Sequence, residues 1–525
     1  MNPAYMRLLA LTGAVSSLPW SSEALSAASC SVDTFQSFLD ANKILATVQT
    51  ATSVASNGTF TVPADEEAYT TSPTGLRALC AIQVNETSEA GTHYTFGLFL
   101  PEDWNGRYLT VGNGGYAGGI NWIDMGAGVG YGFAVMSTDT GHRGNYQATS
   151  WAYGNPESIT DWGWRAMHGS TVTSKVLIEA WYGTSPKYNY FSGCSVGGRQ
   201  GLKALQMFPE DYDGVSVGAP AWWTTHLQLD AVKTLTYNQP AGAKHAITKT
   251  MFNIIGAEVL RQCDPQDGLT DTIISDPSSC RFDPTQLLCN GKANTDCLIG
   301  EQIQTLYKIY NDWVETNQTF VFPHYLLGTE GQWSQSIGDG SSSSLENQYG
   351  YAQDLLMLGP SWTWEDLSLA TVQLSDAMNP GNATADEFDI SPFHSRGGKL
   401  IHHHGLSDAP LPLEVASTIR HCMSTPSNVN APWYIAGANQ AAQLGASVSG
   451  VPGYHDAAHD VILALVAWVE NGTAPNSIIA TEYTNDNVAS GVMRQRPICP
   501  HPQQAKFDGV GNPNDADSWH CALLY

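Results

Sequence analysis

The segment from 188 to 207, YNYFSGCSVGGRQGLKALQM, constrains the fold of this chain more than any other stretch. A β-prone run, YNYFSG, leads into a turn of small residues around Ser195, and a helical pattern follows. Residues 193–197, GCSVG, fit G-x-S-x-G, a sharp strand-to-helix turn that exposes a serine. Glycines are needed there because side chains would hold the strand and the helix apart. The segment therefore predicts a nucleophilic serine, Ser195; the alternative is a glycine-rich turn with a capping serine.

Strand-like and helix-like patterns alternate on both sides of this turn. Strand patterns, with the loops that end them, occupy 107–115, 131–141, 213–220 and 399–408, and helical patterns occupy 170–183 and 459–472. This alternation predicts an α/β fold with a mostly parallel sheet.

The alternation loosens between about 222 and 395. This region holds four of the ten cysteines and many tryptophans and tyrosines. We expect one α/β core made of 28–221 and 396–525, with 222–395 as a large inserted lid domain. The tryptophans of the insertion either cover a site or pack as ordinary core residues.

The chain is acidic and carries few charges. Its formal charge is −26, and charged residues make up 14% of it, against about 25% in an average soluble domain. We therefore expect neither nucleic acid nor an anionic membrane as a partner. Arg7, a short apolar run and small residues up to Ala28 predict a signal peptide at 1–27, with a disordered apolar tail as the alternative. No later stretch reaches the ~18 apolar residues of a membrane helix.

Cysteines and glycosylation sequons agree with export. Ten cysteines at irregular spacings favour disulfides over a zinc site. Five N-x-[ST] sequons begin at Asn57, Asn85, Asn317, Asn382 and Asn471. Together with the N-terminal pattern, these features predict a secreted glycoprotein.

The other catalytic groups are sought by their order along the chain. The Val196 N–H at the helix start can stabilise an oxyanion, and a second donor should come from an earlier strand-to-loop segment. The loop GNGGYAGG at 112–119 fits, with Gly114 or Gly115 as the donor, unless it is only a turn. The acid and the base should follow the serine in that order, and Asp408 comes after a predicted strand. Order alone does not choose the base among His421, His455, His459, His501 and His520.

These motifs resemble the fungal tannase and feruloyl esterase family. Residues 190–221 resemble its G-C-S-x-G-G block and the GAPA strand that follows, and HGLSD at 404–408 resembles its acid motif. In the family, a cysteine directly precedes the serine, an Asp lies far along the chain, and a His-Cys pair supplies the base. The cysteine of that pair forms a disulfide with the cysteine before the serine. The resemblance implies an α/β-hydrolase core with Ser195 as nucleophile, Asp408 as acid and His421 as base.

The resemblance also gives Cys194 a role. It implies a Cys194–Cys422 bridge that holds Ser195 and His421 together, so that Cys194 is neither a nucleophile nor a metal ligand. The other eight cysteines are then expected to pair in sequence order: Cys30–Cys80, Cys263–Cys280, Cys289–Cys297 and Cys499–Cys521.

CDPQDGLTDTII at 263–274 resembles the calcium loop of the family. The resemblance implies carboxylate ligands from Asp264, Asp267 and Asp271 and carbonyl ligands from Leu269 and Ile273, around a structural Ca²⁺. Oxygen ligands packed around a glycine suit this ion. The segment is not an EF-hand, because the bidentate glutamate of that motif is absent, and the alternative is an acidic turn.

The chain departs from the family pattern between acid and base. Asp408 and His421 are thirteen positions apart, and two of the residues between them are prolines. A helix and a strand normally lie there in the family, and they do not fit into so few residues. His455 is a rival base, but Cys422 as the partner for Cys194 favours His421.

The resemblance implies a secreted serine carboxylesterase. Its substrates would be feruloyl or other hydroxycinnamoyl esters, free or linked to plant cell-wall polysaccharides. A tannase acting on galloyl esters is one alternative. A catalytically impaired secreted relative that binds phenolic ligands is another, supported by the short connector. A metal-dependent hydrolase has little support, because the histidines at 402–404 lie on a predicted strand whose alternate side chains point to opposite faces.

Overall fold

The computed structural model describes residues 29–240, 242–291, 296–338, 348–409 and 451–523. The signal peptide predicted at 1–27 lies outside them and stays a prediction. Among the helices of the described ranges, none is both long and apolar enough to cross a membrane.

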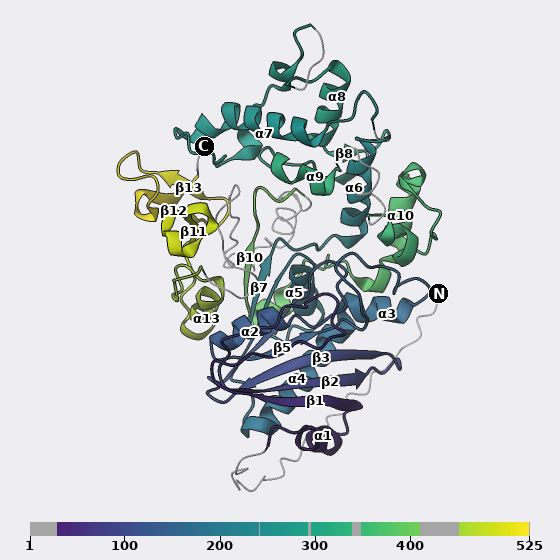
Figure 1. Cartoon of the computed structure of the whole chain (residues 1–525), viewed down its shortest axis with the longest axis vertical. Coiled ribbons are helices and arrows are strands. Elements are labelled where there is room, and N and C mark those ends of the chain that lie inside the picture. Colours follow the sequence, from purple (N-terminus) through teal and green to yellow (C-terminus); the bar gives the residue numbers. More distant parts are fainter. Residues whose placement is uncertain (1–28, 241, 292–295, 339–347, 410–450, 524–525) are drawn as a thin grey trace, which may run out of the picture.

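The core of the chain is an eight-stranded sheet in the order β1-β2-β3-β5-β4-β6-β7-β10 (Figure 1). Its strands are β1 Ala46–Val54, β2 Leu79–Thr87, β3 His93–Pro101, β4 Arg107–Val111, β5 Ala134–Thr138, β6 Tyr188–Cys194, β7 Gly214–Gly218 and β10 Lys399–His403. From β5 to β10 all neighbours are parallel, as the α/β pattern predicts. The first three strands pair antiparallel with one another, and β3 pairs antiparallel with β5. The sequence patterns predicted no strands in this N-terminal part.

Helices cover both faces of the sheet. The principal helices of the core are α1 Val32–Ala41, α2 Trp122–Gly130, α3 Pro156–Thr160, α4 Ala166–Tyr182, α5 Val196–Met207 and α13 Val461–Asn471. α2 and α13 pack on one face through side chains such as Trp122 and Leu465. α4 and α5 contribute Leu177 and Leu202 to the other apolar cluster.

The ends of two predicted helices are set by their capping residues. α4 ends at Gly183 and α13 at Gly472, both in the left-handed conformation that glycine adopts without strain. Asp460 caps the start of α13: its carboxylate accepts hydrogen bonds from the N–H groups of Ile462 and Leu463. Such a cap stabilises a helix by about 1 kcal/mol.

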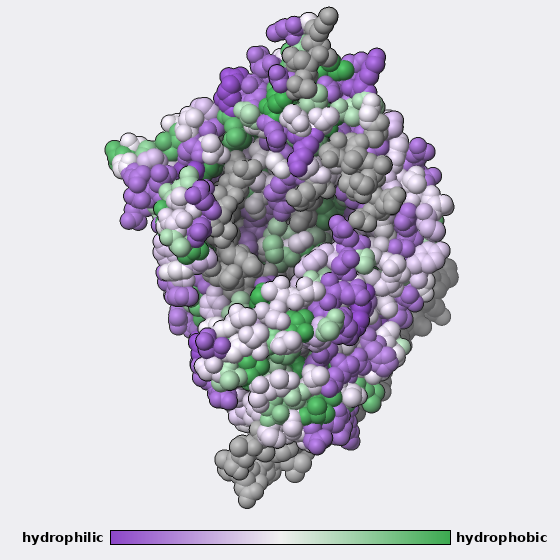
Figure 2. Space-filling view, in the orientation of Figure 1, coloured by the Kyte–Doolittle hydropathy of each residue, from purple (hydrophilic) through white to green (hydrophobic). Residues whose placement is uncertain are grey.

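The chain leaves the sheet after β7 and returns at β10. The segment between these strands, here called the insertion, contains α6 Thr224–Thr236, α7 Lys249–Cys263, α8 Gly300–Ile309, β8 Trp313–Val314, β9 Phe320–Phe322, α9 Trp333–Ser336, α10 Leu369–Met378 and α11 Ser391–Ser395. Part of it has its own apolar core, which includes Phe252, Ile255 and Trp333. Figure 2 shows that the face viewed in Figure 1 is hollowed between the insertion and the sheet.

Two small antiparallel sheets end the described chain. They are formed by β11 Ile478–Tyr483 with β12 Val492–Ile498, and by β13 Gln504–Phe507 with β14 Trp519–Ala522. The structure contains the four disulfides expected from sequence order: Cys30–Cys80, Cys263–Cys280, Cys289–Cys297 and Cys499–Cys521.

The sequon asparagines differ in exposure. Asn57, Asn317, Asn382 and Asn471 are exposed. Asn85 is half-buried in β2, where its side chain donates to Thr95 Oγ1 at 3.2 Å. Glycosylation stays a prediction at all five.

Candidate active site

Ser195 occupies the turn between β6 and α5 in a strained conformation, with φ 59° and ψ −123°. Such a conformation costs a non-glycine residue on the order of 1–3 kcal/mol. Backbone hydrogen bonds hold it in place. Ser195 N–H donates to Gly218 O at 2.9 Å, and Ser195 O accepts from Arg199 N and Ala221 N, each at 3.0 Å. The turn therefore has the strained backbone of a G-x-S-x-G nucleophile turn, and several hydrogen bonds hold it in that conformation.

The glycines of the turn allow the strand and the helix to meet. A Cβ on Gly193 would lie 2.7 Å from the carbonyl carbon and oxygen of Gly197. A Cβ on Gly198 would lie 2.7 Å from Gly218 O. These neighbours are backbone atoms that cannot rotate away, so the spacing of the motif follows from packing.

The glycine loop after β4 lies against the first turn of α5. A Cβ on Gly112 would be 2.7 Å from Gly197 Cα. Gln200, buried on α5, forms two hydrogen bonds with Asn113: its Oε1 accepts from Asn113 N at 2.9 Å, and its Nε2 donates to Asn113 Oδ1 at 3.2 Å. The loop predicted to carry the second oxyanion donor is thus fixed to the helix that Ser195 begins.

The two predicted donors of this loop differ in availability. Gly114 N–H donates to the Tyr69 hydroxyl at 2.8 Å. Other N–H groups of the loop, those of Gly112, Asn113, Tyr116, Ala117 and Gly118, also have acceptors. Gly115 N–H has no acceptor within the residues that the structure describes. Val196 N–H, at the first position of α5, is one of the donors that a helix start leaves without an intrahelical partner. Val196 and Gly115 are therefore the available pair.

Asp408 lies within electrostatic reach of the nucleophile turn. It follows β10, and its N–H donates to Gly405 O at 3.2 Å. Cys194 is exposed at the surface, although protein atoms surround much of its thiol. Burial raises the pKa of this thiol to about 11, and the negative charge of Asp408 acts in the same direction. As a thiol, Cys194 is protonated at neutral pH and is therefore a weak nucleophile.

The predicted base and its neighbour, His421 and Cys422, lie outside the described residues. Their roles, and the Cys194–Cys422 bridge, stay predictions. Within the part of the chain that the structure describes, Cys194 forms no disulfide.

Three of the other candidate histidines lie beside acidic residues near them in sequence. His459 Nδ1 bonds Asp456 Oδ1 at 2.9 Å, and its ring stacks on Tyr454. His455 is exposed and lies near Asp460 at the start of α13. His520 and Cys521 form a second His-Cys pair, so His421-Cys422 is not the only one in the chain. Cys521 is bonded to Cys499, and His520 Nδ1 bonds Asp508, so this pair cannot supply the family bridge.

Of the three histidines predicted on a strand, His402 and His403 end β10 and His404 follows it. His402 and His404 are 2% exposed, and burial lowers the pKa of His402 well below its ordinary value. His403, at the alternate position, has a pKa lowered by burial to about 4. No three His, Cys, Asp or Glu side chains of the described ranges are grouped so that they could hold a metal ion.

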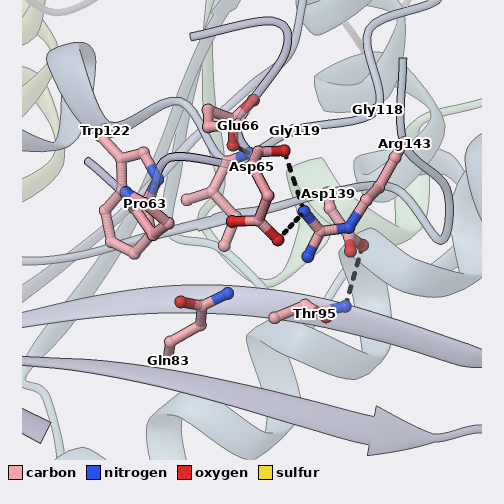
Figure 3. Close-up of a pocket in the computed structure, with 11 residues that line it drawn as sticks. Pro63, Asp65, Glu66, Gln83, Thr95, Gly118, Gly119, Trp122, Asp139 and Arg143 are labelled. Carbon is pink, nitrogen blue, oxygen red and sulfur yellow. Dashed lines mark hydrogen bonds and ion pairs between the residues drawn. The ribbon is translucent and has the colours of Figure 1, made fainter. Parts of the chain in front are cut away.

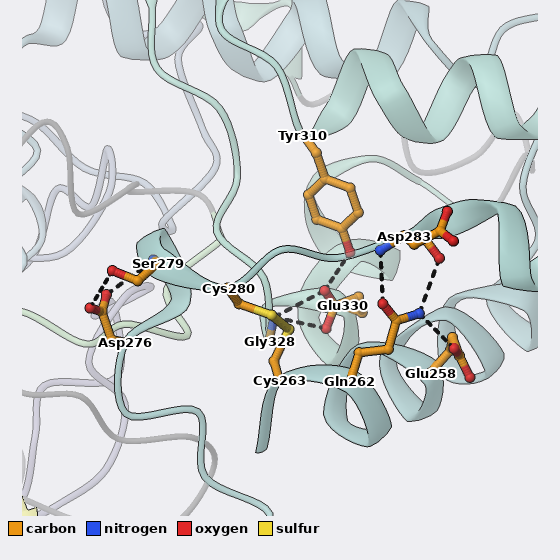
Figure 4. Close-up of a disulfide and its surroundings, with 10 residues drawn as sticks. All are labelled: Glu258, Gln262, Cys263, Asp276, Ser279, Cys280, Asp283, Tyr310, Gly328 and Glu330. Atoms are coloured by element: carbon orange, nitrogen blue, oxygen red, sulfur yellow. Dashed lines mark hydrogen bonds between the residues drawn. A yellow bond between two sulfur atoms is a disulfide. The ribbon is translucent and has the colours of Figure 1, made fainter. Parts of the chain in front are cut away.

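The predicted calcium loop is closed by the Cys263–Cys280 disulfide (Figure 4). Carboxylate and carbonyl oxygens are the donors that a hard cation prefers. In the described residues, however, Asp264, Asp267 and Asp271 are not grouped as a metal site. All six of their carboxylate oxygens already accept hydrogen bonds from protein groups, one of them from Arg496. Burial raises the pKa of Asp271, Arg496 opposes this shift, and the charges of Asp267 and Asp264 reinforce it. Each carboxylate oxygen has a further lone pair, so calcium at this loop stays a proposal.

Calcium binding is tested by thermal unfolding. If the loop holds Ca²⁺, the ion at about 100 times its Kd stabilises the native state by about 2.7 kcal/mol, and chelation removes this gain. Asp267→Asn should abolish the difference, whereas Asp276→Asn, at a half-buried acid that caps the next helical turn and lies outside the proposed ligand set, should keep it. Equal melting temperatures with calcium and with chelator would exclude a structural ion.

Comparison with known proteins agrees with this geometry. The family model described as tannase and feruloyl esterase matches residues 78–325 and 354–522. A probable feruloyl esterase B-1 of Aspergillus oryzae is 30% identical over 469 residues, which cover 85% of this chain and 84% of that protein. A crystal structure of feruloyl esterase B from Aspergillus oryzae superposes with a TM-score of 0.84 at 28% identity, covering 93% of this chain and all of that one.

A tannin acyl hydrolase from Aspergillus niger has the same fold, with a TM-score of 0.71 at 20% identity, covering 94% of this chain and 96% of that one. The fold is thus an α/β-hydrolase core with a large insertion. The chain belongs to the tannase and feruloyl esterase family of carboxylic ester hydrolases.

Proposed function

We propose that this chain hydrolyses feruloyl and related hydroxycinnamoyl esters of plant cell-wall material through Ser195. The observation that carries the proposal is the strained Ser195 turn, with the glycine loop packed on its helix, in a chain of this family. The named relatives, which include feruloyl esterases matched over most of their length, support the substrate class.

The proposed reaction has two halves. Ser195 Oγ attacks the ester carbonyl carbon while His421 takes its proton, and Asp408 orients the imidazole. The carbonyl oxygen becomes an oxyanion that accepts hydrogen bonds from Val196 N–H and Gly115 N–H. His421 returns the proton to the leaving alcohol, which leaves an acyl-serine. Water then attacks the acyl group by the same route and releases the free acid.

Specificity for the acyl group is tested with two small esters. We expect hydrolysis of methyl ferulate with a higher kcat/KM than that of methyl gallate. The reverse order would identify a tannase, the second candidate, which the family description favours as much as the first. Failure of folded protein on both esters would contradict the proposal for this substrate class.

A further inference from the structure

Tyr69, which lies outside every motif found in the sequence, holds the glycine loop next to Ser195. Its hydroxyl oxygen accepts a hydrogen bond from Gly114 N–H at 2.8 Å, and its side chain is buried, with 7% of the residue exposed. Burial raises the pKa of the Tyr69 phenol, so the group stays neutral over the range in which such proteins are assayed.

The segment that carries Tyr69 is anchored to the same loop. Glu66 Oε1 accepts from the N–H groups of Ala68 at 3.0 Å and Tyr69 at 3.2 Å. Glu66 Oε2 accepts from Ile120 N at 3.1 Å, at the far end of the glycine loop. The approach is so close that a Cβ on Gly119 would collide with the Glu66 carboxylate. One side chain therefore ties the backbone of Tyr69 to the loop that its hydroxyl also contacts.

A second anchor lies beside the first. Arg143 Nη1 donates to Asp65 O at 3.0 Å and pairs with Asp65 Oδ2 at 2.5 Å. Figure 3 shows Asp65 and Arg143 joined by these bonds next to Glu66, Gly118 and Gly119. Bonds from both Asp65 and Glu66 thus hold the 63–69 segment, and they fix the position of Tyr69.

Gly115 lies between two residues that are each held by a tyrosine. Gly114 N–H is bound by the Tyr69 hydroxyl, and Tyr116 N–H donates to Tyr146 O at 2.9 Å. The two tyrosine rings meet edge to face, with centroids 5.4 Å apart. Gly115 has φ 53°, and a Cβ there would lie 2.6 Å from Tyr146 O, so only glycine fits. Its N–H is the one left available on this stretch of loop.

We propose that Tyr69 is a positioning residue for the oxyanion site: by holding Gly114 N–H, it fixes the loop with Gly115 N–H as the second donor. The proposal rests on the proposed serine mechanism but not on the identity of the acyl group. Without the hydroxyl, Gly114 N–H loses its acceptor, and the backbone directly before Gly115 loses one of the bonds that fix its orientation. Oxyanion donors stabilise the transition state because they are already in position before the reaction. A misplaced donor therefore destabilises the transition state and lowers kcat, while substrate binding changes little.

The test compares Tyr69→Phe with Tyr182→Phe. Both changes remove a hydroxyl and keep the ring; Tyr69 is buried and Tyr182 is half-buried. The Tyr182 hydroxyl donates to Pro101 O at 2.6 Å, at the end of β3. We expect Tyr69→Phe to lower kcat on p-nitrophenyl acetate about 10- to 100-fold with KM changed less than 2-fold. Tyr182→Phe should change kcat less than 2-fold, and the melting temperatures show whether both variants are folded.

A second readout separates this proposal from the choice of substrate. The rate at which a fluorophosphonate modifies Ser195 depends on the oxyanion site and not on the acyl specificity, so it should fall in Tyr69→Phe by a factor similar to that for kcat. Wild-type protein that is labelled but inactive on methyl ferulate would contradict the substrate class and leave Tyr69 to be judged by the labelling rates. Equal labelling rates in Tyr69→Phe and wild type, or an equal loss in Tyr182→Phe, would overturn the positioning role.

Discussion

Replacing Ser195 with alanine is expected to lower kcat by about 10⁵-fold or more, because it removes the atom that forms the covalent intermediate. Stability should change by no more than about 0.5 kcal/mol, since the half-buried hydroxyl is not part of the core. The hydrogen bonds that hold the turn all involve the backbone of residue 195 and are kept. Measurement of kcat and of the melting temperature on the same preparation checks both expectations.

Ser192 provides the matched control. It lies three residues earlier on β6 and is buried, with 2% exposure. Ser192→Ala should leave kcat within a few-fold of the wild-type value. If Ser195→Ala kept more than about one hundredth of the activity, a nucleophilic Ser195 would be untenable.

Gly193→Ala is expected to have the second large effect. The added Cβ would lie 2.7 Å from two backbone atoms of Gly197, so β6 and α5 must move apart. Overpacking of this kind costs about 1–3 kcal/mol of stability. A displacement of about 1 Å at the reacting serine lowers kcat by about 100-fold. Denaturant unfolding measures the loss of stability. Steady-state kinetics, at a temperature where the variant is folded, measures the loss of kcat separately.

Gly300→Ala is the control for this change. Gly300 is the first residue of α8, and a Cβ there would meet no atom within 4 Å. Alanine should therefore leave activity unchanged and stabilise the protein, by up to about 1 kcal/mol. Wild-type activity in Gly193→Ala would show that close packing of strand and helix is not what the motif requires.

Local patterns predicted much of the fold. The strand–turn–helix around Ser195 and the helix ends at Gly183 and Gly472 depend on short-range signals. The four disulfides were expected in sequence order only after the family resemblance had assigned Cys194 and Cys422 to each other. The antiparallel N-terminal strands were not assigned. β3 is buried along nearly all its length, and such a run lacks the apolar–polar alternation that identifies a half-buried strand.

Motifs predicted which residues belong to the candidate site, and the catalytic roles of these residues stay predictions. The residues that hold them in place were not predicted. Ser195, Asp408 and the glycine loop were found from motifs, and the structure sets the loop against α5 and Asp408 near Cys194. Gln200 and Tyr69 were missed. Each acts through a hydrogen bond to a residue far along the chain, Gln200 to Asn113 and Tyr69 to Gly114, and no local sequence pattern encodes such a pair.

The central claim is that Ser195 is an activated nucleophile despite the short connector to His421. Fluorophosphonates modify serines that an adjacent base has activated, so the probe tests the serine and its base together. The measurement is the mass of the folded protein after labelling, followed by a tryptic map of the peptide 188–199, which contains both Ser192 and Ser195. The account predicts one adduct per chain, on Ser195, and none in Ser195→Ala. Folded protein without an adduct, or with the adduct on another residue, would contradict it.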